Sequence, residues 1–333
     1  MAIRMARQEK VPMLILSPDT LTFGEDNMKD PGPEWATFLI DDHGPAAHSA
    51  LTTKWNIACR TNLDLYPNLH RAIYFANQIP RGPVLVEVPF DIMMSSFDGI
   101  DNRSPMPITS DATQASDTHL LSIATIIGSA KYPIIITESF GKNKKAISTL
   151  TACAETIGAP IFEWWMPCYA NVDRSHALHS IAPVESIIAE ADVIIVAASN
   201  GPWHSPATPL NTEAKVIVID EDPMRPRSAY WGYTTTHCVS GDPVINLEKI
   251  VENIKANSAG LASAAAQRTE HWAKRNKEEK IKFEEIAALE SDKAAKEGKI
   301  HASTFFTALS RTLPPGSIIV DEIVAQVDFT CTN

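Results

Sequence analysis

The sequence predicts an α/β fold, in which parallel sheets carry helices on both faces. Three observations support this class. Short aliphatic runs alternate along the chain with longer segments of helical periodicity, which is the order of a parallel sheet and its crossover helices. The runs at 133–137 and 193–197 are apolar at almost every position, as expected of strands buried on both faces. Glycine and proline separate the segments. We expect a three-layer central domain flanked by two incomplete α/β domains.

Length and charge limit the possible classes of function. With 333 residues, of which 44% are hydrophobic, the chain is long enough for about two globular domains. A formal net charge of -11 without any basic block disfavours binding to nucleic acid or to an anionic membrane. No apolar run approaches the ~20 residues that span a bilayer, and the amino terminus lacks the pattern of a signal peptide. We expect a cytoplasmic protein with no nucleic-acid or membrane partner.

The cysteines predict neither a metal site nor a disulfide framework. Cys59, Cys153, Cys168, Cys238 and Cys331 stand far apart, and none of them forms a CxxC pair. We expect reduced thiols that pack mostly as small apolar groups.

The first segment, residues 1–94, predicts only part of a domain. An apolar run at 11–17 predicts a buried strand, and a long loop rich in Pro, Gly, Asp and Asn follows it. Apolar residues near helical spacing over 69–79 predict a helix, which a Gly-Pro turn joins to a strand at 84–88. Residues 95–117 are polar and aperiodic, which predicts an interdomain linker.

Residues 118–257 predict a central, Rossmann-like α/β domain. A helix at 144–157 ends at Gly158, where glycine favours a C-terminal cap. Asp242 and Pro243 form a favourable N-cap and first position for the last helix of the domain. The remaining predicted elements are strands at 133–137, 161–162, 193–197 and 216–219, and a short helix at 184–191.

The carboxy-terminal part predicts less structure. Residues 258–299 predict a small-residue linker followed, from residue 268, by a charged and solvated helix. A helix at 302–313 and a strand at 317–320 begin a further α/β domain over 300–333. One helix and one strand cannot bury a core, so we expect this domain to be truncated.

Polar residues after two of the central strands form a candidate nucleotide site. Ser199, Asn200 and Gly201 follow one strand, and their backbone N–H groups could hold a phosphate. Asp220 ends the next strand, where an acid can accept hydrogen bonds from a ribose. The alternative is that the acids Asp220, Glu221 and Asp222 cap the next turn and face water. The sequence has no GxGxxG motif, so support for dinucleotide binding is weak.

Other motifs do not complete an active site. The histidine pairs His43–His48 and His176–His179 lack a third ligand beside them, which disfavours a zinc site. The stretch FGKNKK lacks the spacing of a phosphate-binding P-loop, and no GxSxG elbow occurs. We therefore assign no catalytic residue and no metal ligand from the residues alone.

Several stretches, taken in order, resemble a known family. ARQEKVPMLILSPDT is similar to a middle strand of that family's first domain, Thr53-Lys54-Trp55 to its Thr-Lys-Trp stretch, and RGPVLVEVPFDI to its closing strand. KVIVIDEDP, with a later Gly-Asp, resembles a run of the central domain, and PPGSIIVDE an opening strand of the third. The chain thus resembles the thiamine-diphosphate-dependent enzymes of the acetolactate synthase and benzoylformate decarboxylase group.

The resemblance implies a three-domain parent. Residues 1–94 correspond to the carboxy-terminal half of a pyrimidine-binding-type domain, and 300–333 to the start of a pyrophosphate-binding-type domain. The central domain is of the DHS-like NAD/FAD-binding type, in which FAD or ADP binds in some relatives. Here we expect a vestigial or empty site at Ser199, Asn200, Gly201 and Asp220. Thiamine diphosphate and Mg²⁺ are the cofactors that the resemblance implies for the parent.

The departures from the family pattern concern catalysis. In this family a glutamate early in the first domain activates the cofactor, and it lies upstream of the position that corresponds to Met1. The family's Gly-Asp-Gly metal motif is absent from the sequence. Glu322 corresponds to a position close to the active site of the intact enzyme. The stretch SPDTLTF also differs from the family's commoner Gly-Arg-Thr-Pro, which leaves the subfamily open.

Two hypotheses follow from the sequence. In the first, the chain is a fragment of a thiamine-diphosphate- and Mg-dependent 2-oxo acid decarboxylase or carboligase, an acetolactate synthase-like lyase or transferase, and is inactive alone. A small 2-oxo acid is then the substrate of the parent, which forms a homodimer or homotetramer. In the second, the chain is a non-enzymatic α/β module for nucleotide binding or assembly.

Overall fold

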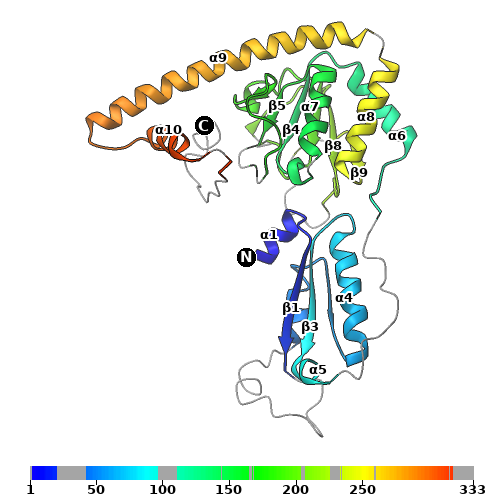
Figure 1. The fold of residues 1–333 in the computed structure, drawn as a ribbon. Helices are drawn as coiled ribbons and strands as arrows, with labels where there is room; N and C mark the ends of the chain where they lie inside the picture. The colour runs from blue at the N-terminus through cyan, green and yellow to red at the C-terminus, as the bar shows by residue number, and fades with distance from the viewer. Residues whose placement is uncertain are drawn as a thin grey trace. The chain divides into compact units, whose positions relative to one another are not determined.

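The computed structural model divides the chain into two compact units, Met1–Thr113 and Gln114–Asn333 (Figure 1). The division falls inside the stretch that the sequence predicts to be a linker. The structure describes residues 2–20, 43–96, 111–143, 145–164, 167, 169–203, 207–225, 233, 235–258, 260–314 and 316–317.

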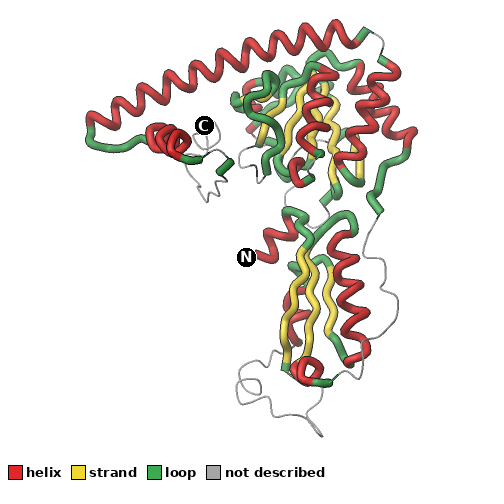
Figure 2. Tube along the Cα trace, viewed as in Figure 1, coloured by secondary structure: helices red, strands yellow, loops and turns green. Residues whose placement is uncertain are grey.

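The first unit contains a three-stranded parallel sheet in the order β1-β3-β2 (Figure 2). The central strand β3 is buried at every position, as its apolar sequence predicts. The strands are β1 (Met13–Asp19), β2 (Trp55–Ala58) and β3 (Pro83–Pro89). The helices are α1 (Ala2–Gln8), α3 (Gly44–Ser49), α4 (Asn62–Asn77) and α5 (Phe90–Met94).

Helix α4 begins earlier than the sequence predicts. The predicted helix at 69–79 is only its second half, because a capping box between Thr61 and Asp64 fixes the start of the helix before Asn62. A helix end of this kind satisfies backbone N–H groups that would otherwise lack partners. Helix α5 also follows β3 directly, where the sequence predicts no helix before the linker.

Glu87 is a buried acid in the centre of the first sheet, and it fixes the short helix α3. One of its carboxylate oxygens accepts a hydrogen bond from the backbone N–H of Ala46 at 2.8 Å. Gly44 begins α3 with a φ of +76°, and a Cβ atom there would lie 2.9 Å from Glu87 Oε2. Both conditions favour glycine at this position. Burial, followed by a nearby Asp19, raises the pKa of Glu87, although the hydrogen bond from Ala46 lowers it.

The second unit contains a six-stranded parallel sheet in the order β6-β5-β4-β7-β8-β9. Counted from β4, this is the order 3-2-1-4-5-6 of a Rossmann fold, which confirms the α/β class predicted from the sequence. The strands are β4 (Pro133–Thr137), β5 (Ile161–Glu163), β6 (His179–Ser180), β7 (Val193–Ala197), β8 (Lys215–Asp220) and β9 (His237–Ser240).

The two faces of this sheet are covered differently. Helices α6 (Asp117–Gly128), α7 (Ala146–Ile157) and α8 (Pro243–Asn257) pack against one another on one face. Right-handed crossovers require the connections from β6 to β7 and from β7 to β8 to pass over the other face. That face is covered by irregular segments, in which Ile188 and Trp203 are buried.

One predicted helix is absent from these connections. The segment 184–191 contains a single 3₁₀ turn, Val184–Ser186, and Ile187 then leaves the helical backbone with a φ of -128°. Its apolar residues are buried at positions that mimic helical spacing, which is why the sequence predicted a helix.

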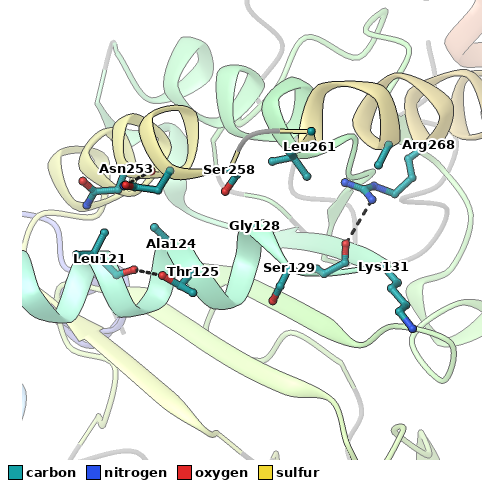
Figure 3. Close-up of a pocket in the computed structure, with 14 residues that line it drawn as sticks. Leu121, Ala124, Thr125, Gly128, Ser129, Lys131, Asn253, Ser258, Leu261 and Arg268 are labelled. Carbon is teal, nitrogen blue, oxygen red and sulfur yellow. Dashed lines mark hydrogen bonds between the residues drawn. The ribbon is translucent and has the colours of Figure 1, made fainter.

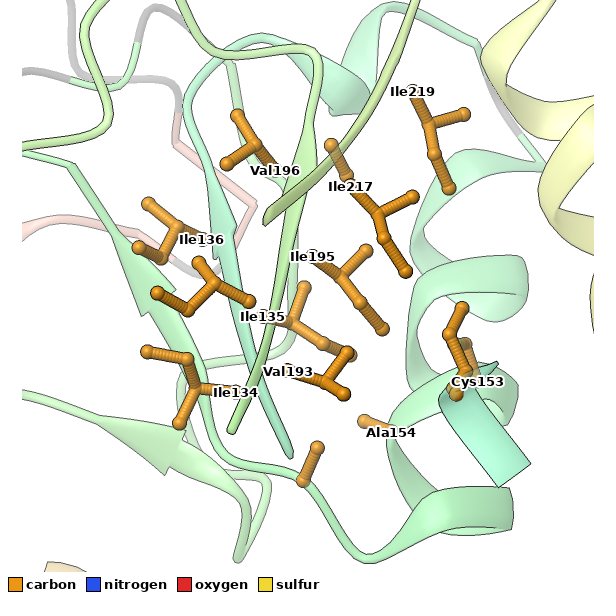
Figure 4. Packing of buried hydrophobic residues seen from close by; sticks show 14 of the residues in the cluster. Ile134, Ile135, Ile136, Cys153, Ala154, Val193, Ile195, Val196, Ile217 and Ile219 are labelled. Atoms are coloured by element: carbon orange, nitrogen blue, oxygen red, sulfur yellow. The ribbon is translucent and has the colours of Figure 1, made fainter. Parts of the chain in front are cut away.

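The core of the second unit is aliphatic and continuous (Figure 4). Ile135, Ile195 and Ile217 occupy neighbouring central strands, and each is fully buried. Cys153 packs among them from α7, and complete burial raises the pKa of its thiol to about 12. The structure therefore confirms the packing role predicted for this cysteine.

Both predicted caps of the central helices are confirmed. Gly158 ends α7 in the left-handed conformation, with a φ of 62°. Asp242 begins α8, and its carboxylate accepts hydrogen bonds from the backbone N–H groups of Val244 and Ile245.

Helix α9 (Leu261–Lys296) begins inside the stretch that the sequence predicts to be a linker. Ala265 is buried in this early part of the helix, and the Arg268 guanidinium then donates to the carbonyl oxygen of Ile157 at 2.6 and 2.9 Å. Trp272 then packs edge-on against Phe162, with ring centroids 6.5 Å apart. Helix α10 (Ala302–Thr312) follows as predicted, and the strand predicted at 317–320 lies almost wholly outside the described residues. Among the helices described, none is long and apolar enough to cross a membrane.

Candidate functional site

The candidate site lies at the carboxyl edge of the six-stranded sheet. Strands β4 and β7 are neighbours, but the chain leaves β4 toward β5 and leaves β7 toward β8. In open α/β sheets, ligands bind beside such a pair of strand ends, so we call this position the crevice. The loops after β4, β7 and β8 meet there.

Glu138 joins the loops after β4 and β7. Its Oε2 atom accepts hydrogen bonds from the backbone N–H of Asn200 at 2.6 Å and from the hydroxyl of Ser199 at 3.1 Å. The backbone N–H of Ser139 also donates to the carbonyl oxygen of Ala198 at 2.8 Å. One of the backbone N–H groups that the sequence assigns to a phosphate, that of Asn200, therefore contacts a carboxylate of the chain itself.

Asp220 joins the loops after β7 and β8. It is 1% exposed, and its carboxylate accepts from the Arg225 guanidinium at 3.2 Å and from the backbone N–H of Asp222 at 2.8 Å. The same guanidinium donates to the carbonyl oxygen of Ser199. Asp220 thus caps the turn after β8, as the alternative predicts, but it is buried and does not face water.

Aromatic residues form one wall beside this pair. The rings of Trp203 and Tyr233 lie 5.0 Å apart between centroids, and both side chains are buried. Burial raises the pKa of Tyr233 to about 12, with Arg225 lowering it and Asp220 raising it to smaller extents. Tyr233 therefore remains neutral near pH 7 and serves as packing.

Asn171 holds the loop after β4 in place through hydrogen bonds to the backbone of that loop. Its side-chain nitrogen donates to the carbonyl oxygen of Glu138 and to Glu163, both at 3.0 Å, while its oxygen accepts from the N–H of Gly141 at 2.8 Å. A Cβ atom at Gly141 would lie 2.0 Å from the carbonyl oxygen of Ala170, so only glycine fits the loop. The backbone that carries Glu138 is therefore held from two sides.

Glu163 extends this contact to the edge strand. Its second carboxylate oxygen lies 3.2 Å from Arg174 Nε and 3.4 Å from His179 Nε2. Burial alone would raise the pKa of Glu163, but hydrogen bonds from His179 and Asn171 and the charge of Arg174 together lower it. We expect a permanently ionised structural acid near neutral pH.

The structure brings together the predicted residues Ser199, Asn200, Gly201 and Asp220 at one crevice edge, since β7 and β8 are adjacent. Sequence reasoning missed Glu138, although its position directly after an aliphatic strand matches the signal used for Asp220. Arg225, Asn171 and Tyr233 lie in loops, and no periodic pattern marks them.

Several other predicted positions have different outcomes. Glu322 and Cys168 lie outside the described residues. His179 contacts Glu163, and His176 lies 3.2 Å from Glu155, so the two histidines of this pair face different acids. Among the side chains that the structure describes, no group of three His, Cys, Asp or Glu residues could hold a metal.

A cavity of about 490 Å³ opens at the opposite edge of the sheet (Figure 3). It lies where α6 and α8 end and α9 begins, and residues such as Thr125, Ser258 and Leu261 line it. Arg268 borders it and donates to the carbonyl oxygen of Ala130 at 3.3 Å. Burial lowers the pKa of Arg268, and Asp192 partly offsets this effect. The guanidinium thus donates to carbonyl oxygens at the end of α7 and just after the end of α6. We therefore interpret this cavity as the space between helices that meet there.

Comparison with known proteins places this fold in a functional context. Residues 120–243 match the family model described as thiamine pyrophosphate enzyme, central domain. The chain is 23% identical over 245 residues to 2-hydroxyacyl-CoA lyase 2 of Homo sapiens, across 62% of this chain and 38% of the relative. It is 23% identical over 240 residues to 2-hydroxyacyl-CoA lyase 2 of Mus musculus, across 61% and 38%. The matches thus span about 38% of the length of these curated relatives.

A solved structure supports the fold assignment. The chain matches benzoylformate decarboxylase from Polynucleobacter necessarius with a TM-score of 0.58 and 19% identity, over 76% of this chain and 46% of that one. At this identity the likeness concerns the fold.

Proposed function

We propose that this chain forms part of an enzyme that cleaves or forms a carbon–carbon bond. The reason is that the chain belongs to the thiamine-diphosphate-dependent enzymes. The observation that carries the proposal is the match of residues 120–243 to the central domain of that family, on a sheet with the corresponding Rossmann strand order. Bound thiamine diphosphate supplies an electron sink for the carbanion that such a reaction produces.

A 2-oxo acid is our first candidate for the substrate. Benzoylformate decarboxylase carries a 2-oxo acid in its name, and an acetolactate synthase-like decarboxylase or carboligase would use the same class. A second candidate is a 2-hydroxyacyl-CoA, which the names of the curated relatives favour. In both, the bond that breaks lies beside a carbon that bears oxygen.

The described residues do not form a thiamine diphosphate site by themselves. Gly241-Asp242 is the nearest sequence to a Gly-Asp-Gly motif, but Asp242 Oδ1 already accepts from two backbone N–H groups at the start of α8. Among the residues that the structure describes, no group of three His, Cys, Asp or Glu side chains could hold a metal ion. We therefore propose that the groups that hold the cofactor and Mg²⁺ lie outside the described residues, and we assign no catalytic step to this chain.

The alternative of a nucleotide-binding module has less support. In such a module the donors at Ser199 and Asn200 and the acceptor at Asp220 would face a ligand. They instead contact Glu138 and Arg225. We retain as a proposal a role in assembly, through the homodimer or homotetramer that the family resemblance implies.

The proposed function can be tested on the native protein. Antibodies against this chain would isolate the polypeptide from its source cells, and cofactor-dependent cleavage of 2-oxo acids and of 2-hydroxyacyl-CoA would be measured by CO₂ and aldehyde release. We expect cleavage that requires added thiamine diphosphate and Mg²⁺. The recombinant 333-residue chain should give no turnover. A native protein without any thiamine-diphosphate-dependent cleavage would contradict the proposal.

A further inference from the structure

The crevice at the carboxyl edge of the second sheet already contains an anion, and the anion belongs to the chain. A backbone N–H and a hydroxyl that converge on one oxygen are the donors with which loops at strand ends bind phosphate. Here the Asn200 N–H and the Ser199 hydroxyl converge on Oε2 of Glu138, at 2.6 and 3.1 Å. The carboxylate thus takes the position of a phosphate oxygen.

The acceptor at the other side of the crevice is also occupied. Asp220 contacts Arg225 at 3.2 Å, and the two side chains are 1% and 9% exposed. A ribose hydroxyl would have to displace this buried ion pair, which would leave a charge without its partner. Residues at the crevice therefore do not fit ADP or FAD as the structure stands.

The backbone around these contacts is strained in the same place. Ala198 has a φ of 47° and Arg225 a φ of 41°, and neither is a glycine. Left-handed backbone at such residues is unfavourable and persists where surrounding contacts hold it, commonly at functional sites. Here the hydrogen bonds from Ser139 to Ala198 and from Arg225 to Ser199 hold both residues.

We propose that Glu138 is an internal ligand that closes a latent anion site, and that removal of its carboxylate opens this site to the phosphate groups of a nucleoside diphosphate. In the closed state the carboxylate both occupies the donors and repels a second anion. Its backbone carbonyl accepts from Asn171 at 3.0 Å, which holds the turn that carries the side chain. The inference rests on contacts within the second unit and does not depend on the proposed reaction.

The test uses the full recombinant chain and titration calorimetry with inorganic phosphate and with ADP. Glu138→Ala frees the two donors, so we expect a dissociation constant about tenfold lower than that of the wild type, or lower still, which is the effect of one charge-assisted hydrogen bond. Glu138→Gln keeps an acceptor oxygen for Asn200 and should gain less. Glu190→Ala removes one exposed carboxylate from the same unit and should bind as the wild type does.

Two results would overturn the proposal. One is a wild-type chain that binds ADP as tightly as Glu138→Ala does, and the other is a folded Glu138→Ala variant that gains no affinity. Should Glu138→Ala fail to fold, amide hydrogen exchange of the wild type decides. The Asn200 N–H should be protected without any nucleotide and should stay unchanged with saturating phosphate, and exchange at an unprotected rate would contradict its bond to Glu138.

Discussion

Asn171 is a fully buried amide that joins three segments of the second unit. It donates to Glu163 in β5 and to the loop after β4, and it accepts from Gly141 in that loop. A buried amide is favourable only when its hydrogen bonds are made, and its partners Glu138 and Gly141 lie 33 and 30 residues away in the sequence. Position in the fold, and not local sequence, therefore determines its role.

The acid paired with this amide predicts a pH dependence of stability. Because the folded chain lowers the pKa of Glu163 below its ordinary value of 4.5, this group stabilises the fold above the unfolded pKa. The stabilisation is lost as the pH falls below about 4.5 and through the folded pKa. We expect Glu163→Gln to be less stable than the wild type at pH 7, with a smaller further loss between about pH 5 and pH 3.

Urea unfolding across this pH range would measure the effect. Glu155→Gln is the matched control, because Glu155 is an exposed acid of the same region that lies 3.2 Å from His176. A pH slope for Glu163→Gln equal to that of the wild type would be evidence against the assignment.

At the residue scale, the sequence predicts which residues share one edge of the sheet but not which side chains they contact. Ser199, Asn200, Gly201 and Asp220 were identified because strand ends in a parallel sheet share an edge. Their partners Glu138 and Arg225 could not be paired with them in advance. The pairing depends on loop geometry, which no hydrophobic period reports.

The start of helix α8 shows how local sequence determines an element. Asp242 is buried and caps the helix with two hydrogen bonds at 2.9 and 3.3 Å, and Pro243 occupies the first turn. We expect Asp242→Ala to lower the free energy of unfolding of the second unit by about 1 kcal/mol, within a range of roughly 0.5–2.

Chemical denaturation followed by circular dichroism would measure this loss. Glu252→Ala on the same helix removes an acid from an exposed pair with Lys249, and such a pair contributes little. An equal loss in both variants would show that charge, and not capping, is responsible.

The predicted elements of the second sheet are confirmed where a strand is continuously apolar, because burial on both faces leaves a clear pattern. Helix α6 was missed, although its apolar residues Leu120, Ile123 and Ile127 are buried with helical spacing. Its start lies in the polar stretch assigned to the linker, which concealed it. Strand β6 has only two residues, too few for any period to be visible.

At the scale of the whole molecule, the first unit leaves apolar sheet surface in solvent. Strand β1 lies at the edge of its sheet and alternates between half-buried and exposed residues, of which Leu16 is 58% exposed. Leu14 lies on the same face and is 36% exposed. Exposed apolar patches on edge strands promote association.

We therefore expect the chain to associate with increasing concentration, and Leu16→Lys to weaken this association because it places a charge on the exposed face. Sedimentation velocity over a range of concentrations would measure it. Leu51→Lys is the control, since Leu51 is 88% exposed but lies outside any strand. Equal association of the wild type and Leu16→Lys would mean that β1 is not the contact. The homodimer or homotetramer predicted for the parent stays a prediction.

Helix α9 has a mechanical consequence. Asn276 donates to Ala177 and Lys280 donates to Arg174, which ties this part of the helix to the body of the second unit. From Lys280 to Lys296 the helix extends about 24 Å at 1.5 Å per residue, and α10 is attached near its far end through Ser291 and Ser303. A tilt of about 5° at Lys280 would displace that end by about 2 Å over this length. The contacts of Asn276 and Lys280 thus act as the pivot of a lever, and small changes beside them are amplified where α10 lies.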